Sequence, residues 1–316
     1  MTAKQILNII FERRKLLDNE ADIDSKLPVE RLPKEEIEPH LSIIEKMVAE
    51  RKPIFMILPA FPGKSPNRNK TLSKLPDLAE THAIDILYDL CRSIELIYSP
   101  GAIVNICSDG HVFSDLVRIP DKDVKLYSLE LINYFKNFYP NSFLFYDLCD
   151  AFPELDSFDA MREELMILFG ESLLELKTQA RTKKEVISMY QGITRFLHED
   201  FLGLDEFKDT SRAQIQKLAK SISLRVIQRS NAWGRLLEHK YPDSLRLSIH
   251  PQYRISRKIG IQMTSTDDCW RTPWHSVAVK KNGIIYLEKR CNINENRNRL
   301  NFENGRPYYY QADDAN

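Results

Sequence analysis

The sequence predicts an α/β protein with a mostly parallel sheet flanked by helices, a helical insertion and a C-terminal β-hairpin. Short apolar runs occur at 54–58, 102–107 and 142–146, and a helical pattern separates each run from the next. Continuous apolar runs are typical of strands covered on both faces. Strands that alternate with helices form right-handed crossovers in a parallel sheet. A fourth run at 245–249 adds another strand.

The N-terminal 50 residues are predicted to form a helical extension. Residues 3–17 place apolar side chains at helical spacing between charged ones, as in an amphipathic helix. Residues 18–50 are charged and contain three prolines, which indicates a loop followed by a short helix.

Residues 51–290 are predicted to form the main domain. Helical patterns cover 82–98, which stops before Pro100 and Gly101, and 121–138, which begins after Pro120. The region from about 154 to 240 is helical throughout.

The end of the main domain is predicted to be a hairpin. Residues 277–280 and 284–288 flank an Asn282-Gly283 step, which is a strong hairpin signal. Residues 291–316 are rich in Asn and Arg and are expected to form a loosely ordered tail.

The composition excludes several classes of protein. Among 316 residues, 45 Lys and Arg balance 45 Asp and Glu, which argues against a nucleic-acid binder or a polybasic membrane binder. No apolar run approaches the length of a membrane span, and the first residues do not resemble a signal peptide. The five cysteines have no CxxC spacing and are expected to be reduced thiols. We therefore expect a cytoplasmic protein.

The glycines and histidines exclude common cofactor and metal motifs. No GxG spacing occurs, so the dinucleotide fingerprint is absent, and the P-loop position that needs glycine before Gly63-Lys64-Ser65 is Leu58. His198 and Asp200, with His239 downstream, imitate the ligand order of iron oxygenases, but they lie in a helical stretch. These observations argue against an NAD enzyme, a P-loop ATPase and an iron oxygenase.

Charged residues gather where the predicted strands end. Lys64, Arg68 and Lys70 follow the first strand and could bind a phosphate or carboxylate, or form a solvated basic turn. The segment 108–115, after the second strand, offers two carboxylates, a histidine and two hydroxyls. The fourth strand delivers Arg246, Ser248 and His250. In an open α/β sheet, ligands bind beyond the carboxyl ends of the strands, so we predict one shared pocket for an anionic substrate.

These loops resemble the isocyanide (isonitrile) synthase family, also called the pyoverdine/dityrosine biosynthesis family. The resemblance spans about 220 residues and rests on the segments ILPAFPGKSPNRNKTLSKLPDLAE (57–80), CSDGHVFSDLVRIPDKDV (107–124), YQGITRFLHEDF (190–201), RSNAWGRLLEHKYPDSLRLSIHPQ (229–252) and TPWHSVAV (272–279). It implies a Rossmann-like fold without a nucleotide, and it implies no metal and no cofactor. It also implies conversion of the amine of an aromatic amino acid, tyrosine or tryptophan, to an isocyanide, with the carbon taken from C2 of ribulose 5-phosphate. The implied pathway partner is an Fe(II)/2-oxoglutarate oxygenase.

Loop position suggests roles for individual residues in this chemistry. Phosphate binding, proton transfer, carboxylate binding and an aromatic pocket all need side chains at the strand ends. We predict catalytic roles for Lys64, Ser65, Asp109, His111, Asp115 and His250. We predict substrate binding by Arg68, Lys70, Ser108, Ser114, Arg246, Ser248, Trp274 and His275.

Two alternatives remain open from the sequence. A fungal branch of the same family resembles an enzyme that gives an N-formylated tyrosine. A non-catalytic module that binds a sugar phosphate and regulates a partner is the second alternative, and the number of acid–base groups in the three loops argues against it.

Overall fold

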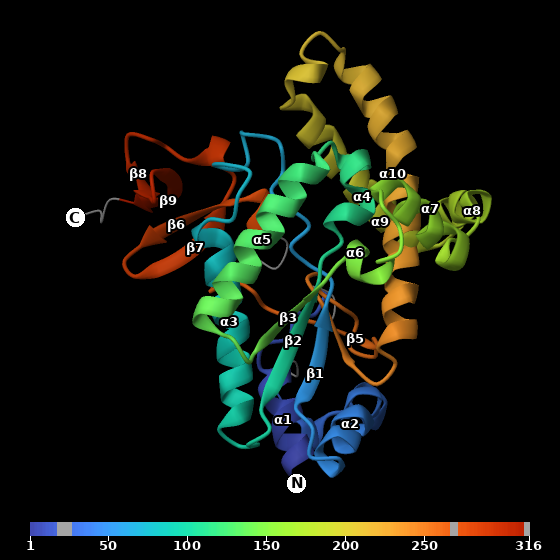
Figure 1. Ribbon diagram of the computed structural model, residues 1–316, viewed down its shortest axis with the longest axis vertical. Coiled ribbons are helices and arrows are strands. Elements are labelled where there is room, and N and C mark those ends of the chain that lie inside the picture. Colours follow the sequence, from blue (N-terminus) through green and yellow to red (C-terminus); the bar gives the residue numbers. More distant parts are fainter. Residues whose placement is uncertain (18–26, 266–270, 313–316) are drawn as a thin grey trace.

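Five parallel strands form the central sheet in the order β3-β2-β1-β4-β5 (Figure 1). Their bounds are β1 (Ile54–Leu58), β2 (Ala102–Cys107), β3 (Phe143–Tyr146), β4 (Leu245–Ser248) and β5 (Lys258–Gly260). The four predicted strands are confirmed, and β5 is an additional strand that no apolar run had indicated. The chain moves outward from β1 to β3 and then returns to pair β4 on the other side of β1. The carboxyl ends of β1 and β4 therefore mark the point where ligands bind in such sheets.

The structure is a computed structural model that describes residues 1–17, 27–265 and 271–312. The four cysteines within these ranges are free thiols, as predicted, and Cys269 lies outside the described residues. No helix in the described ranges is both long and apolar enough to cross a membrane.

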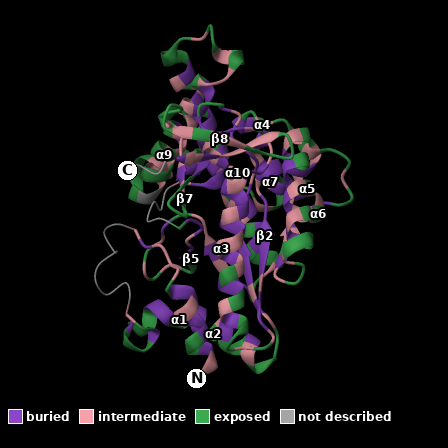
Figure 2. Cartoon of the chain, turned by 90° about the vertical axis from the view of Figure 1, so that its left-hand side faces the viewer, coloured by how far each residue is buried: buried purple, intermediate pink, exposed green. Residues whose placement is uncertain are grey.

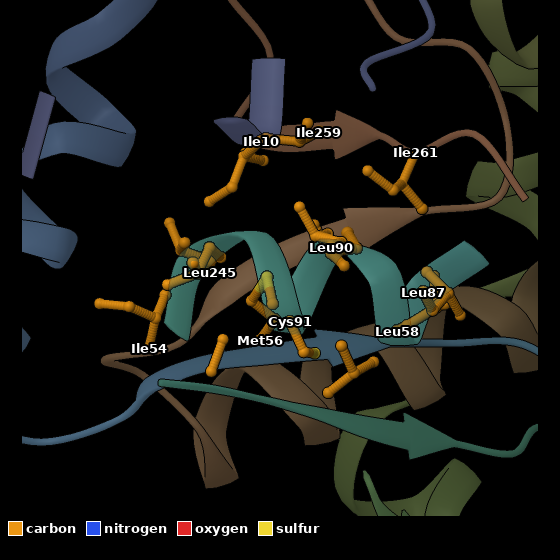
Figure 3. Close-up of a cluster of buried hydrophobic side chains, with 14 of the residues drawn as sticks. Ile10, Ile54, Met56, Leu58, Leu87, Leu90, Cys91, Leu245, Ile259 and Ile261 are labelled. Atoms are coloured by element: carbon orange, nitrogen blue, oxygen red, sulfur yellow. The ribbon is translucent and has the colours of Figure 1, made fainter. Parts of the chain in front are cut away.

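Four helices pack around one face and the amino ends of the sheet. They are α1 (Thr2–Phe11), α2 (Lys34–Ala49), α3 (Leu78–Glu95) and α5 (Asp121–Phe138). Figure 3 shows Leu87, Leu90 and Cys91 of α3 against Met56 and Leu58 of β1. Burying a large apolar side chain contributes about 1.5–3 kcal/mol, so this cluster is a main source of stability.

The first helix is shorter than predicted. It ends at Phe11, although the apolar pattern continued to Leu17. Arg14 and Leu16 instead form isolated bridges with Ile261 and Gln252, next to β5. Pairing with this edge of the sheet has overridden the local helical preference.

Further helices lie on the opposite side of the sheet. They are α4 (Gly110–Val117), α6 (Leu148–Ala151), α7 (Phe158–Phe169), α8 (Leu173–Thr182), α9 (Lys184–Leu202) and α10 (Arg212–Lys240). Of these, α4, α6, α7 and α10 cover the face of the sheet, and α8 and α9 pack against α10. Trp233 of α10 is buried here and stacks on Tyr146 of β3, with ring centroids 5.7 Å apart. The helical region predicted over 154–240 is confirmed, whereas α4 replaces a predicted loop.

The C-terminal part of the chain forms a second, four-stranded sheet in the order β7-β6-β9-β8, at the left of Figure 1. Its strands are β6 (Val277–Lys281), β7 (Ile284–Glu288), β8 (Asn298–Glu303) and β9 (Arg306–Ala312). The predicted hairpin is confirmed as β6-β7, with Asn282 and Gly283 both at positive φ. The segment after residue 291 is not a loose tail, because β8 and β9 pair with each other and β9 pairs with β6. The domain boundaries themselves stay a prediction.

The two ends of the parallel sheet have different surroundings. The helices α1 and α2 lie near the N-terminus, at the amino ends of the strands (Figure 1). The carboxyl ends face α4, α10, the loop after β1 and the short 3₁₀ helix η4 (Pro273–His275). Figure 2 shows β2 as buried along most of its length. The predicted site residues lie mainly in this second region.

Candidate active site

The loop after β1 carries Lys64, and the structure buries this side chain completely. Its ammonium lies 2.9 Å from Asp77 Oδ2 and 2.8 Å from Glu80 Oε2, at the N-terminus of α3. It also donates a hydrogen bond to the carbonyl oxygen of Pro273 at 3.2 Å. Although burial opposes the charge, the two carboxylates raise the pKa of Lys64. A protonated amine is not a nucleophile, so the geometry favours a structural role for Lys64.

The next polar residues of this loop are held by α9. Ser65 donates a hydrogen bond from Oγ to Asp200 Oδ2 at 3.0 Å. The Lys70 ammonium lies 2.5 Å from Asp200 Oδ1 and 3.3 Å from Glu199 Oε2. Arg68, by contrast, is exposed and hydrogen-bonds only to Thr71 among the described side chains. The sequence thus placed three cations together, but protein carboxylates already contact two of them.

Asp109 lies just beyond the end of β2, at the start of α4. It occupies the N-cap position but makes no side-chain capping hydrogen bond. Its Oδ1 is buried and has no hydrogen-bond partner in the described residues. Burial raises the pKa of Asp109 to about 7. A carboxyl group with such a pKa can gain and lose a proton near neutral pH, as a general acid–base must.

The other polar residues of this segment belong to an ion-pair cluster around Arg162. This arginine of α7 is buried and donates to the His111 carbonyl oxygen at 2.7 Å and to Ser114 Oγ at 2.8 Å. Asp115 lies 2.5 Å from Arg229 and 3.6 Å from Arg162 Nε. Ser114 and Asp115 therefore join α4 to its neighbouring helices, and the geometry favours structural roles for both.

His111 and Ser108 also have protein partners. The His111 ring stacks on Phe158 with centroids 3.9 Å apart, and its Nδ1 lies 3.6 Å from Asp147 Oδ2. These three residues line a groove of about 470 Å³ beside the edge strand β3. Ser108 donates from Oγ to the carbonyl oxygen of Phe61 at 3.0 Å and so joins the loops after β1 and β2.

The fourth strand presents Arg246 and Ser248 on the face toward α10, alternating with two buried leucines. Arg246 donates to the carbonyl oxygen of Gly234 at 3.2 Å and lies 3.2 Å from Glu238. Burial raises the pKa of the Cys107 thiol, with Asp109 adding to the shift and Arg246 opposing it. Asp109 and Arg246 therefore both lie close enough to the Cys107 thiol for their charges to affect it.

Two histidines lie near the end of β4 and are both neutral at physiological pH. His250 is exposed to solvent, yet surrounding protein lowers its pKa to about 4, and the charges of Lys15 and Lys258 lower it further. Burial lowers the pKa of His275 well below its usual value, and the nearby cations, Lys70 first, add to this. The His275 ring packs on Phe196, with centroids 4.6 Å apart. Neutral imidazoles can accept protons.

Ser248 and Trp274 have mainly structural surroundings. Ser248 Oγ accepts hydrogen bonds from the His250 N–H and from Gln252 Nε2, both at 3.1 Å, and so shapes the turn after β4. Trp274 is buried in the main core with its ring edge against Phe61 at 5.3 Å. It supports the loop after β1 from within.

The structure therefore divides the predicted residues into two sets. One set is held by the structural contacts described above, and the other remains as candidates for contact with a substrate. Asp109 and His250 follow the carboxyl ends of β2 and β4, Arg246 lies in β4, and Lys70 and His275 lie in the loop after β1 and in η4. Such a set of cations, neutral imidazoles and one carboxyl group titrating near pH 7 suits repeated proton transfers on an anionic substrate. Within the described ranges, no group of three or more His, Cys, Asp or Glu side chains could hold a metal ion.

Comparison with known proteins identifies the family of this chain. The family model of the pyoverdine/dityrosine biosynthesis proteins matches residues 44–300. The chain belongs to this family.

Relatives in the family are similar over nearly the whole chain. An L-tryptophan isonitrile synthase of Fischerella ambigua is 39% identical, over 98% of this chain and 91% of the relative. An L-tyrosine isonitrile synthase of Xenorhabdus nematophila is 38% identical, over the same shares of the two chains. The crystal structure of the PvcA protein from Pseudomonas aeruginosa superposes with a TM-score of 0.89 at 35% identity, covering 98% of this chain and 99% of that one. The α/β fold implied by the resemblance is thus confirmed.

Several residues of the site were not predicted. Asp77 and Glu80 neutralise Lys64, and Asp200 binds both Ser65 and Lys70. Asp200 lies in the family segment 190–201, but we had considered it only as a false metal ligand. Two features of the sequence could have predicted its role as a partner of these cations. They are its position in that segment and the excess of cations after β1.

Proposed function

We propose that this protein converts the amino group of an aromatic L-amino acid, tyrosine or tryptophan, to an isocyanide in the biosynthesis of a natural product. The main support is the full-length similarity to L-tryptophan and L-tyrosine isonitrile synthases, at 38–39% identity. The similarity to the first of these relatives extends over 98% of this chain.

Ribulose 5-phosphate supplies the carbon in this proposal. The amine attacks the C2 carbonyl and water leaves to give an imine. Inorganic phosphate is then eliminated, and the two carbon–carbon bonds that join C2 to C1 and to C3 break. The former C2 is left as the isocyanide carbon, and the other four carbons of the sugar are released. An Fe(II)/2-oxoglutarate oxygenase would process the product.

Each step of this course requires proton transfer. Asp109 is suited to act as the acid–base, because its carboxyl group is buried, has a pKa of about 7 and has one oxygen without a partner in the described residues. His250 and His275 stay neutral because their pKa values are lowered, so their imidazoles can accept hydrogen bonds from the sugar hydroxyls. Arg246 can bind the amino-acid carboxylate through its guanidinium group.

The test is mass spectrometry of purified protein with tyrosine or tryptophan and ribulose 5-phosphate labelled with carbon-13 at C2. A product with one labelled isocyanide carbon supports the proposal, and the responding amino acid identifies the substrate. A labelled formamide alone, after rapid quenching, would favour the N-formyl branch. Absence of label across the common amino acids would contradict the proposal.

A further inference from the structure

Four cations lie where the loop after β1 meets the linker between β7 and β8, which contains the short 3₁₀ helix η5 (Arg290–Asn292). Two backbone hydrogen bonds join these segments. The Cys291 N–H donates to the carbonyl oxygen of Asn69 at 2.8 Å, and the Arg290 N–H donates to that of Lys70 at 3.4 Å. Arg68 and Lys70 of the loop therefore lie beside Lys289 and Arg290, which belong to the linker between β7 and β8 of the C-terminal sheet.

The two lysines of this group are paired with acids. Glu199 Oε2 lies 2.8 Å from the Lys289 ammonium and 3.3 Å from that of Lys70. Asp200 is the second carboxylate, 2.5 Å from Lys70. Glu199 and Asp200 are thus the two acids of α9 in contact with this group, and both are paired with lysines.

The two arginines have no ion pair within the described ranges of the chain. Arg68 makes one side-chain hydrogen bond, to Thr71 at 3.3 Å. Arg290 lies against the hydroxyl of Tyr310, which donates to Glu295 at 3.1 Å. Partial burial lowers the pKa of Arg68, and the charge of Arg290 lowers it further, although Asp123 opposes the shift.

Asp123 favours the charged form of Arg68, but it makes its contact ion pair with another cation. Its carboxylate lies 2.7 Å from the Lys74 ammonium. Arg68 and Arg290 are therefore like charges held close together, an arrangement whose repulsion an anion would relieve. Guanidinium groups bind phosphate oxygens through two parallel hydrogen bonds.

We propose that Arg68 and Arg290 bind the phosphate group of the sugar-phosphate substrate, so that the C-terminal sheet completes the active site. This inference rests on the proposed function. The four cations face two carboxylates at contact distance, which leaves two positive charges for the anion. A phosphate monoester dianion carries that charge, whereas the carboxylate of an amino acid carries only one.

The experiment is steady-state kinetics of Arg290→Gln and Arg68→Gln with each substrate varied in turn. We expect KM for ribulose 5-phosphate to rise by about 10- to 100-fold in each variant, while KM for the amino acid stays within about twofold. Arg290→Lys keeps the charge but loses the planar donor group, so it should give a smaller rise. Arg299→Gln is the control, because Arg299 is exposed on β8 of the same sheet.

Several results would overturn the inference. An unchanged KM for ribulose 5-phosphate would contradict it, and a rise confined to the amino-acid KM would assign the arginines to a carboxylate instead. If Arg290→Gln fails to fold, the exposed Arg68→Gln carries the test. If the wild-type protein forms no labelled isocyanide, the proposed function fails first. Calorimetric titration with ribulose 5-phosphate then tests the subsite alone, and equal affinity in wild type and Arg290→Gln would exclude it.

Discussion

The Lys64 ammonium and the Glu80 carboxylate lie 2.8 Å apart, and neither side chain reaches solvent. Glu80 also accepts a hydrogen bond from the Asp77 N–H, within the capping box that begins α3. One buried cation therefore joins the loop after β1 to the start of the helix that follows it. Because Ser65 comes next in the chain, this ion pair also fixes where the loop enters the active site.

Replacing Lys64 should strongly destabilise the protein. Lys64→Met would leave two carboxylates buried beside each other without their cation, which costs about 3–5 kcal/mol of the free energy of unfolding. Urea unfolding followed by circular dichroism measures this loss. The control is Lys52→Ala, whose exposed pair with Glu50 should contribute less than about 1 kcal/mol. If Lys64→Met and Lys52→Ala lost the same free energy of unfolding, the buried ion pairs of Lys64 would contribute no more to stability than an exposed pair.

Gly110 should not tolerate a side chain. A Cβ atom there would lie 2.2 Å from the carbonyl oxygen of Pro62 and 2.6 Å from Val124 Cγ1. Gly110→Ala must therefore push α4 away from the loop after β1, at a cost of about 1–3 kcal/mol in the free energy of unfolding. Gly192→Ala is the matched control, because nothing lies within 4 Å of that position in α9. We expect the control to be neutral or to stabilise the protein by up to about 1 kcal/mol, measured by thermal unfolding.

Asp115 was predicted to be catalytic, but its contacts indicate otherwise. Because its carboxylate pairs with Arg229 and Arg162 on neighbouring helices, Asp115→Asn should lower stability by about 1 kcal/mol. The specificity constant kcat/KM should change by less than about threefold, since the pair lies outside the cluster of Asp109 and the histidines. A loss of about a hundredfold or more, the scale of a missing acid–base group, would restore Asp115 as a catalytic residue.

The strands were predictable because each depends on local pattern, whereas the active site depends on distant partners. β5 has three residues and no continuous apolar run, so nothing local distinguished it. The segment of α4 contains Ser, Asp and Gly, which are equally common in turns. Ser65 and Asp200 are 135 residues apart in sequence, and no local pattern shows that they meet. Position at a strand end therefore pointed to Asp109, whose Oδ1 has no hydrogen-bond partner among the described residues, but it did not distinguish Asp109 from Asp115.

Asp109 should govern the pH dependence of catalysis. Its pKa of about 7 predicts that kcat/KM changes with an apparent pKa near 7. Asp109→Asn cannot exchange that proton, so it should lower kcat/KM by about 10²- to 10⁴-fold and remove this part of the pH profile. A pH profile unchanged in the variant would exclude Asp109 as the acid–base.

The same carboxyl group should lower the stability of the wild-type protein at neutral and alkaline pH. Its pKa is raised from 3.8 in the unfolded chain to about 7 in the folded one, so the folded state holds the proton more tightly. The contribution of Asp109 to the free energy of unfolding is then largest at acidic pH and falls as the pH rises from about 4 to about 7. Asp109→Asn should therefore gain about 4 kcal/mol over the wild type between pH 4 and pH 8, since each unit of pKa shift corresponds to about 1.4 kcal/mol. The burial of Glu80 raises its pKa to about 7 as well, so the difference between the two proteins, not the wild-type curve, is the informative quantity. A constant difference across this range, measured by urea unfolding at each pH, would mean that the Asp109 carboxyl group titrates normally in the folded protein.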